Sequence, residues 1–310
     1  MKLLLTGPGF EQRHYEALAA SGFETLHERQ PSRERLIEVL PTISHYLLGG
    51  DEQVDAALLA HASSLRHIAF IGGDAGAFID LEAATKLHIV VSTTPGATAG
   101  AVAEHTIGLL LGLARGLFAQ NEAVKRNAPL VPTTRELSDM RVGIVGLGRI
   151  GLKVAALLRQ GFGATVIYTS ANRKSGVEAE LGLNWTSLPE LFSVCDAVSL
   201  HAPATQQTRG MIGAAILANA RPGLLLVNTA PAALVDPAAL KQALATGQVG
   251  AAAFDGYWQE PPPTSADDAY GFLRLPDARF VVTPHTAAKT TRAWPSMVDA
   301  ALSNMTSSLT

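Results

Sequence analysis

The 310-residue sequence contains a single cysteine, Cys195, and this scarcity excludes two kinds of architecture. One thiol forms no internal disulfide and cannot supply the thiolates of a cysteine-based zinc site. The sequence offers no other set of residues at metal-ligand spacing, and we expect no metal. Cys195 lies in an expected helix, where it is most simply a small core residue. A chain without disulfides fits the reducing cytoplasm.

Long apolar runs and blocks of like charge are also missing. The longest apolar stretch, residues 107–118, is shorter than a bilayer span and contains Arg115, so we expect no membrane-spanning helix. Residues 1–7 resemble a signal peptide only superficially, because their apolar run stops in Gly-Pro-Gly. The 24 basic and 27 acidic residues leave a net charge of −3 and no basic patch. The sequence therefore predicts neither a nucleic-acid nor a membrane partner.

Neither an internal repeat nor a low-complexity linker divides the chain. A Gly-x-Ser-x-Gly motif and paired catalytic carboxylates are absent too, which disfavours a hydrolase. With 47% apolar residues, the chain is long enough to fill two cores. Its one irregular insertion covers residues 259–277 and contains three consecutive prolines.

Strand-like and helical runs alternate along the chain, which is typical of a parallel sheet with covering helices. The first hundred residues have strand patterns at 2–5, 46–48, 68–71 and 89–91, and helical patterns at 15–20, 54–62 and 81–86. Later strand patterns lie at 142–145, 165–168, 197–201, 224–228, 250–255 and 280–283, with helices such as 189–194 and 237–245. Six strands in that order predict a doubly wound domain, and the fold class is α/β with two Rossmann-like parallel-sheet domains.

Between the two sets of strands, residues 101–115 form one long helix that Thr98 can cap. This helix is rich in small residues and apolar on nearly every face, so it must be buried between domains or subunits. Its lack of a polar face is one reason to expect a homodimer.

A glycine fingerprint stands near the middle of the chain, at Gly146, Gly148 and Gly151. The first glycine permits a tight turn, the second lets a pyrophosphate approach the backbone, and the third lets the helix pack on the strand. A glycine-rich turn without a ligand is the alternative. Because a buried strand precedes the glycines and an apolar helix follows them, the pattern favours a dinucleotide site.

A series of short motifs follows one order along nearly the whole chain. They are Ile79-Asp-Leu-Glu-Ala-Ala-Thr85, Thr94-Pro-Gly96, Ala103-Glu-His-Thr106, the glycine turn, His201-Ala-Pro203, Thr208-Arg-Gly210, Val227-Asn-Thr229, Leu234-Val-Asp236, Glu260-Pro261 and Thr283-Pro-His285. In this series the chain resembles the D-2-hydroxyacid dehydrogenase family, which includes glyoxylate/hydroxypyruvate reductases and phosphite dehydrogenases. The resemblance implies a flavodoxin-like substrate domain at 1–96 with 288–310, a dinucleotide-binding Rossmann domain at 97–287, and a homodimer.

By this resemblance, His285 is the general acid that protonates a substrate carbonyl oxygen while a nicotinamide delivers hydride to the carbon. Glu260 is its carboxylate partner. An imidazole titrates near neutrality, and a neighbouring carboxylate stabilises the imidazolium and holds its orientation. The alternatives are a capped turn histidine and a solvated loop carboxylate. A proline–histidine turn at a strand end opposite the cofactor turn favours the functional interpretation.

Two segments depart from the family's substrate site. The family's Asn-Thr-x-Arg-Gly is Asn228-Thr-Ala-Pro-Ala232 here, so Pro231 stands where an arginine clamps the substrate carboxylate. Proline lacks a donor, and a contact worth about 1.5–3 kcal/mol is missing. The family loop Gly-Val-Gly-Val-Asp becomes Gly73-Asp-Ala-Gly-Ala77, and the substrate region then contains Asp74, Ala75 and Gly76. Asp74 repels an incoming carboxylate, unless it only forms a turn and faces solvent.

The strand at 165–168 runs into Thr169-Ser-Ala-Asn-Arg-Lys174, which contains no acidic residue. An NAD site places an acid there on the ribose 2′-hydroxyl, and that acid repels a 2′-phosphate. Two hydroxyls and two cations instead predict NADP (NADPH), although a solvated basic turn also explains Arg173 and Lys174. The expected cofactor contacts are Gly146, Gly148, Arg149, Ile150, Gly151, Thr169, Ser170, Asn172, Arg173, Lys174, Pro203, Thr208, Thr229, Ala230 and Asp255.

Two further histidines are interpreted as structural. His201 lies in the family's His-x-Pro turn near the cofactor, and His105 on the apolar helix lacks companions at metal-ligand spacing. Arg209 and Asp236 match family positions that we interpret as structural supports.

These observations leave three functions open. The first is a cytoplasmic NADPH-dependent reductase in which His285 and Glu260 form the proton-donor pair. Its substrate is an atypical small molecule, either a carbonyl compound without an adjacent carboxylate or an imine. The second is a nucleotide-binding sensor or regulatory protein that has lost activity, as Pro231 suggests. The third is an ordinary glyoxylate or hydroxypyruvate reductase in which another cation, such as Arg292, replaces the missing arginine.

Overall fold

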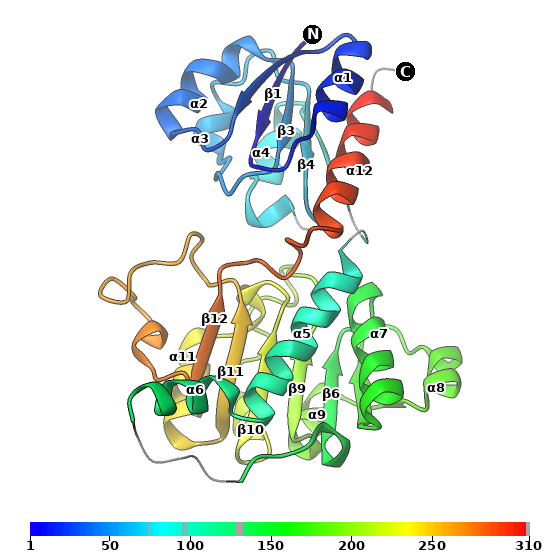
Figure 1. Cartoon of the computed structure of the whole chain (residues 1–310), viewed down its shortest axis with the longest axis vertical. Helices are drawn as coiled ribbons and strands as arrows, with labels where there is room; N and C mark the ends of the chain where they lie inside the picture. The colour runs from blue at the N-terminus through cyan, green and yellow to red at the C-terminus, as the bar shows by residue number, and fades with distance from the viewer. Residues whose placement is uncertain (74, 95, 97, 128–132, 308–310) are drawn as a thin grey trace. The chain divides into compact units, whose positions relative to one another are not determined.

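A computed structural model describes residues 1–307 except 74, 95, 97 and 128–132. The chain divides into two compact units: unit 1 is Met1–Thr98 with Lys289–Thr310, and unit 2 is Ala99–Ala288. The predicted boundaries differ from these by one or two residues. Each unit is built on one parallel sheet with helices on its faces, which confirms the predicted α/β class (Figure 1).

Unit 1 contains a five-stranded sheet in the order β2-β1-β3-β4-β5. Its strands are β1 (Lys2–Thr6), β2 (Glu24–Glu28), β3 (His45–Leu48), β4 (His67–Phe70) and β5 (Val90–Ser92). Its helices are α1 (Gln12–Ala20), α2 (Arg33–Val39), α3 (Ala56–Leu59), α4 (Leu81–Lys86) and α12 (Ala293–Ser307). The central strands β3 and β4 are buried along their whole length, as the continuous apolar runs predict.

The sequence patterns missed two elements of unit 1, the strand β2 and the helix α2. β2 lies at the edge of the sheet and none of its residues is buried, so its sequence Glu-Thr-Leu-His-Glu lacks the apolar pattern of an inner strand. α2 begins where the Ser32 side chain accepts a hydrogen bond from Arg35 N, and only Leu36 and Val39 are buried.

Unit 2 contains a seven-stranded sheet in the order β12-β11-β10-β9-β6-β7-β8. The strands are β6 (Arg141–Val145), β7 (Thr165–Thr169), β8 (Asn184–Trp185), β9 (Ala197–Leu200), β10 (Leu224–Asn228), β11 (Val249–Asp255) and β12 (Phe280–Thr283). The prediction of six strands was wrong by one, because the two residues of β8 form an exposed edge. The chain order reverses between β6 and β9, and ligands of such sheets bind at the carboxyl ends of the strands near this point.

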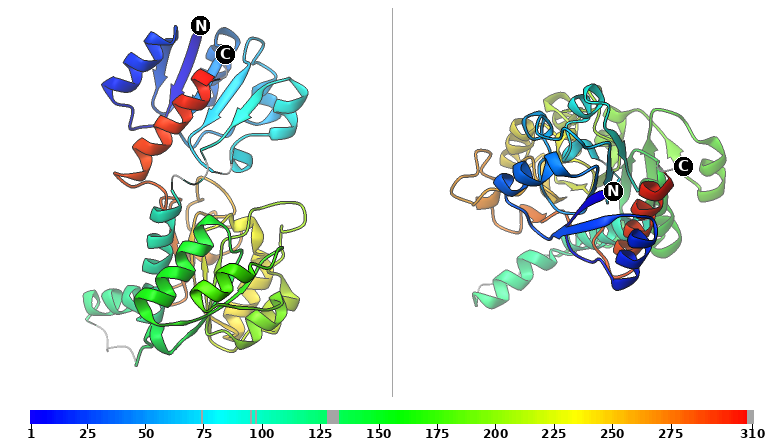
Figure 2. Two further views of the ribbon diagram at one scale, coloured as in Figure 1. Left: turned by 90° about the vertical axis from the view of Figure 1, so that its right-hand side faces the viewer. Right: turned by 90° about the horizontal axis from the view of Figure 1, so that it is seen from above.

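The helices of unit 2 are α5 (Ala99–Ala114), α6 (Leu117–Lys125), α7 (Arg149–Ala156), α8 (Ser175–Leu181), α9 (Leu188–Val194), α10 (Ala214–Ala218) and α11 (Pro237–Thr246). The long apolar helix α5 packs beside α7 and against β10 (Figure 2). The following helix α6 has no buried residue. Among the described residues, no single helix is long and apolar enough to cross a membrane; α5 and α6 pass that test only together and meet at a bend of 59°.

Candidate active site

The glycine turn between β6 and α7 is closed by backbone packing. Gly146 has a φ of +93°, and a Cβ there would lie 2.7 Å from His201 C and 2.8 Å from Ala202 N. A Cβ on Gly151 would overlap the carbonyl oxygen of Gly146. Both glycines are therefore required by the protein's own backbone.

Gly148 differs from its two neighbours in the fingerprint. It is the N-cap residue of α7, and a Cβ there would meet no heavy atom within 4 Å. Arg149 and Ile150 form the first turn of the same helix. Open space above the N-terminus of α7, where backbone N–H groups are unpaired, suits a pyrophosphate. These residues therefore fit a dinucleotide.

The end of β7 lies directly beside this turn, because Gly146 N donates to Thr169 O over 2.8 Å. Beyond it, Ser170 Oγ donates to Asn172 O. Arg173 forms a two-pronged ion pair with Glu178 of α8, with Nε–Oε1 at 2.9 Å and Nη2–Oε2 at 2.8 Å. The Arg173 guanidinium also lies over the Trp185 ring, 5.9 Å from its centroid.

Glu178 is thus a partner of Arg173 in the region predicted to bind the 2′-phosphate. Its carboxylate also accepts a hydrogen bond from Tyr168 Oη over 2.7 Å. The hydrogen bonds from Arg173 and Tyr168 lower the pKa of Glu178 to about 2. At neutral pH the ion pair holds the guanidinium in one orientation, although 63% of the Arg173 side chain stays exposed.

Four other predicted cofactor residues stand where β9 and β10 end. Thr208 Oγ1 donates to Pro203 O over 2.6 Å, which closes the turn after β9. Thr229 Oγ1 lies 2.8 Å from the hydroxyl of Thr106 on α5. Ala230 N donates to Asn228 Oδ1. The structure therefore brings the ends of β6, β7, β9 and β10 to one edge of the sheet in unit 2, where the predicted residues cluster.

The predicted acid pair occupies the same carboxyl edge, beyond β11 and β12. His285 Nδ1 lies 3.6 Å from Glu260 Oε1, an ion-pair distance somewhat longer than a hydrogen bond. The Glu260 carboxylate accepts a hydrogen bond from Tyr257 N over 2.8 Å. The His285 side chain is 47% exposed and that of Glu260 21%, so solvent and a substrate reach the imidazole more readily than the carboxylate.

Asp255 holds the turn that carries His285. Its carboxylate accepts N–H donors from Thr286 and Ala287, both over 2.8 Å, and the hydroxyl of Thr283 over 2.6 Å. His105 Nε2 lies 3.1 Å from the same hydroxyl. Asp255, which was predicted to contact the cofactor, therefore fixes the polypeptide on both sides of the imidazole.

The residues predicted for the substrate region belong to different units. In unit 1, Ala75 and Gly76 lie in a short 3-10 helix, where Ala75 is buried in the core and Gly76 is exposed. Asp74 lies outside the described residues. In unit 2, Pro231 precedes the 3-10 helix Ala232–Leu234, and its carbonyl oxygen accepts a hydrogen bond from Asn228 Nδ2.

Three residues given structural roles in the sequence have partners or burial that fit those roles. Burial lowers the pKa of His201 to about 3, and its Nε2 lies 2.9 Å from Ser199 Oγ, so the ring is neutral. Burial raises the pKa of the Cys195 thiol to about 12. Asp236 is the N-cap residue of α11 and accepts from Ala239 N. Among the described residues, no cluster of three or more His, Cys, Asp or Glu is placed to hold a metal.

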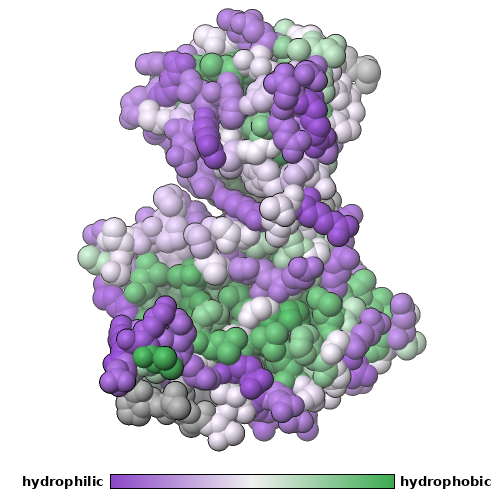
Figure 3. Space-filling model, in the orientation of Figure 1, coloured by the Kyte–Doolittle hydropathy of each residue, from purple (hydrophilic) through white to green (hydrophobic). Residues whose placement is uncertain are grey.

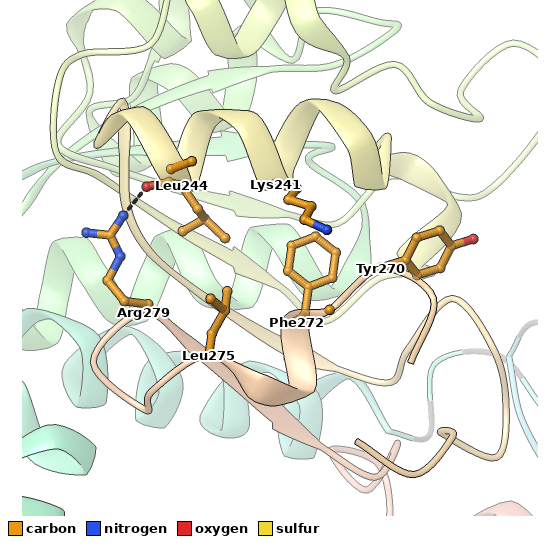
Figure 4. A pocket seen from close by; sticks show the side chains of 8 residues that line it. Lys241, Leu244, Tyr270, Phe272, Leu275 and Arg279 are labelled. Atoms are coloured by element: carbon orange, nitrogen blue, oxygen red, sulfur yellow. Dashed lines mark hydrogen bonds between the residues drawn. The ribbon is translucent and has the colours of Figure 1, made fainter. Parts of the chain in front are cut away.

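A hollow of about 390 Å³ lies elsewhere on unit 2, between α11 and residues 270–279 (Figure 4). Its lining includes Lys241, Tyr270 and Phe272 and none of the predicted site residues. Arg279 donates there to Leu244 O, one of the last carbonyl groups of α11. A cation at the negative end of a helix stabilises the helix, which gives Arg279 a structural role in this hollow.

Sequence reasoning missed two contributors to the site. Glu178 stands in the next helix, and continuing the search for acids five residues beyond Arg173 would have found it. Tyr257 contributes only its backbone N–H to Glu260, and no side-chain pattern signals such a bond.

The chain is similar to known proteins over most of its length. The sequence profile described as "D-isomer specific 2-hydroxyacid dehydrogenase, NAD binding domain" matches residues 107–287. The chain is 36% identical over 251 residues to glyoxylate reductase of Aeropyrum pernix, covering 77% of this chain and 72% of that protein. It is 34% identical over 265 residues to D-3-phosphoglycerate dehydrogenase of Mycobacterium bovis, covering 85% of this chain but only about half, 48%, of that protein.

The fold is shared with solved structures over almost the whole chain. D-lactate dehydrogenase from Aquifex aeolicus, solved as a complex with NAD and lactic acid, matches with a TM-score of 0.82 and 25% identity. The match covers 99% of this chain and 95% of that one.

Proposed function

Because the chain belongs to the D-2-hydroxyacid dehydrogenase family of nicotinamide-dependent oxidoreductases, we propose that it is an NADPH-dependent reductase with His285 and Glu260 as its proton-donor pair. One observation carries this proposal. The acid pair and the glycine turn lie on the same carboxyl edge of one sheet, within unit 2. A nucleotide on the N-terminus of α7 and a proton donor beyond β12 then serve one reaction centre.

The proposed proton path follows from the orientation of the imidazole. Nδ1 faces the Glu260 carboxylate, so Nε2 is the nitrogen that donates to the substrate. The carboxylate stabilises the imidazolium before transfer, and Tyr257 N holds the carboxylate in place. A bound nicotinamide supplies hydride to the electrophilic carbon. After transfer His285 is neutral, and its exposure lets solvent restore the proton.

The choice of NADPH is supported by the residues that follow β7. No acid occupies 169–174, and the region contains two cations, Arg173, which is paired with Glu178, and Lys174. Glu178 and Trp185 fix the guanidinium of Arg173, which reduces the entropy lost when it binds a phosphate. We expect Arg173→Ala to weaken NADPH binding by roughly tenfold, equivalent to the loss of one charge-assisted contact, and to leave NADH binding unchanged.

Fluorescence titration with both cofactors measures this preference. Arg126→Ala is the matched control, because Arg126 also pairs with a glutamate, Glu122, but on α6. Equal weakening of NADPH and NADH binding by Arg173→Ala would contradict the assignment to the 2′-phosphate.

The substrate is proposed to lack a carboxylate next to the reacting carbon. Pro231 provides no donor at the position that the family's arginine occupies, and Asp74 adds negative charge to the matching loop. A non-acid carbonyl compound or an imine requires no arginine to clamp a carboxylate.

Turnover of a substrate panel tests this part. We expect NADPH oxidation with simple ketones or cyclic imines, and low kcat/KM with glyoxylate and hydroxypyruvate. Rapid turnover of glyoxylate at low concentration would instead favour an ordinary oxo-acid reductase in which a cation such as Arg292 replaces the arginine. Tight cofactor binding without turnover of any compound, unchanged by His285→Ala, would favour a sensor or regulatory protein.

We further propose a homodimer located in the cytoplasm. Apolar side chains gather on the surface of unit 2 (Figure 3), and Leu117 and Val124 of α6 are 53% and 65% exposed. A second copy of the chain would cover such residues. Light scattering should give twice the mass of the chain, and a monomer mass at micromolar concentration would contradict the dimer.

A further inference from the structure

Three consecutive residues at the end of β11 form hydrogen bonds with Glu260 or with the neighbours of His285. The Asp255 carboxylate binds the turn after His285, and Gly256 N donates to Thr283 O over 2.9 Å. Tyr257 N donates to the Glu260 carboxylate. The middle residue of the three has no side chain, and its surroundings explain why.

Gly256 lies against the contact between Glu260 and His285. A Cβ there would lie 2.8 Å from Glu260 Oε1 and 3.5 Å from His285 Nδ1. These are the two atoms that stand 3.6 Å apart in the acid pair. The φ of Gly256 is +101°, a conformation that favours glycine.

Resting on the proposed roles of His285 and Glu260, we propose that Gly256 is a positioning residue. The absence of a side chain at position 256 is what lets the Glu260 carboxylate lie against the imidazole. Even a methyl group there displaces the carboxylate from His285.

The backbone that follows Gly256 is held by Tyr257, which limits its movement away from such a clash. Tyr257 is 4% exposed, and its hydroxyl donates to Asp268 Oδ1 over 2.7 Å. Asp268 in turn accepts hydrogen bonds from the backbone N–H groups of Tyr270 and Leu273, so the insertion at 259–277 is anchored to Tyr257 through Asp268. The Glu260 carboxylate, at the end of a flexible side chain, is the group that yields.

Comparison of Gly256→Ala with Gly247→Ala tests the proposal. Gly247 also has a positive φ, of +78°, and a Cβ there would meet nothing within 4 Å, so the control adds a side chain to a positive-φ residue without the contact. In the protein without substrate, NMR of labelled histidine follows the titration of His285. We expect Gly256→Ala to lower the midpoint by about one pH unit, because an imidazolium loses its neighbouring negative charge.

The Gly247→Ala control should titrate as the wild type does. An unchanged His285 midpoint in folded Gly256→Ala overturns the proposal. The NMR experiment needs no turnover, so it decides the role of Gly256 even if every substrate fails and the proposed reductase function is wrong.

A double-mutant cycle supplies the kinetic test. With a substrate that the wild type reduces, Gly256→Ala should lower kcat by about tenfold, as expected for a displaced partner of a general acid, while cofactor affinity stays unchanged. In the Glu260→Ala background the same substitution should change kcat less than twofold, since no carboxylate remains to displace. Equal effects in both backgrounds would show that Gly256 does not act through Glu260.

Discussion

The two halves of the unit 2 sheet hold their site residues by different means. Around β6 and β7, the glycines pack backbone on backbone, and Arg173 and Glu178 pair across five residues of sequence. Around β11 and β12, Asp255 reaches residues 286 and 287, about thirty positions away. The nucleotide half thus depends on close backbone packing and on one ion pair between near neighbours. The acid half depends instead on hydrogen bonds from a later segment to one buried carboxylate.

The largest expected effect lies in the acid half. We expect His285→Gln to lower kcat by about 10²–10⁴-fold, because glutamine cannot donate a proton, with cofactor affinity unchanged. Stopped-flow or steady-state NADPH oxidation measures it. His88→Gln is the control, since His88 is also exposed and also has a positive φ, but belongs to unit 1. Full turnover by His285→Gln would show that His285 is not the proton donor of the reaction.

A smaller effect is expected from the glycines of the nucleotide half. Gly151→Ala and Gly148→Ala should differ in their effects on stability and on cofactor binding. Gly151→Ala forces a Cβ onto the Gly146 carbonyl and should lower the free energy of unfolding by about 1–3 kcal/mol. Gly148→Ala meets no protein atom, so it should keep the stability and weaken only cofactor binding. Thermal unfolding and cofactor titration of both variants separate the two roles. Equal loss of stability would contradict the open space above Gly148.

The smallest expected effect concerns the ion pair beyond β7. Because the pKa of Glu178 is lowered to about 2 from an ordinary 4.5, the pair stabilises the folded state above pH 4.5, and this stabilisation is lost as the pH falls toward 2. Glu178→Gln should therefore unfold at slightly lower temperature than the wild type at pH 7, and the difference should shrink at pH 3. A difference that is constant with pH would mean that the carboxylate charge is not involved.

The same contrast explains how far the sequence predicts this molecule. The glycine turn, the buried strands and the mid-chain helix are patterns of neighbouring residues, so spacing alone places them. The edge strands β2 and β8 were missed because no apolar alternation marks an exposed edge. The predicted division of the chain came from a resemblance and from the position of the fingerprint.

The candidate site was predictable as a set of residues but not as a set of contacts. His285 and Glu260 belong to motifs, whereas Asp255 was expected only as a cofactor contact. The N–H donors of Tyr257, Thr286 and Ala287 have no signature in their side chains. Backbone donors are supplied by any residue except proline, so only the folded chain shows which of them face a carboxylate.

Unit 1 is built from two segments of the chain that lie on either side of unit 2 in the sequence. Unit 2 is one continuous segment, whereas the core of unit 1 includes Met297, Val298 and Met305 of α12, which follow unit 2 in the sequence. On the ribosome, the segment that carries the glycine turn and the acid pair is complete before the last helix of unit 1 is made. Residues 1–98 of unit 1 are therefore synthesised long before α12, and the face of β3 and β4 that α12 covers stays open until all of unit 2 has been made.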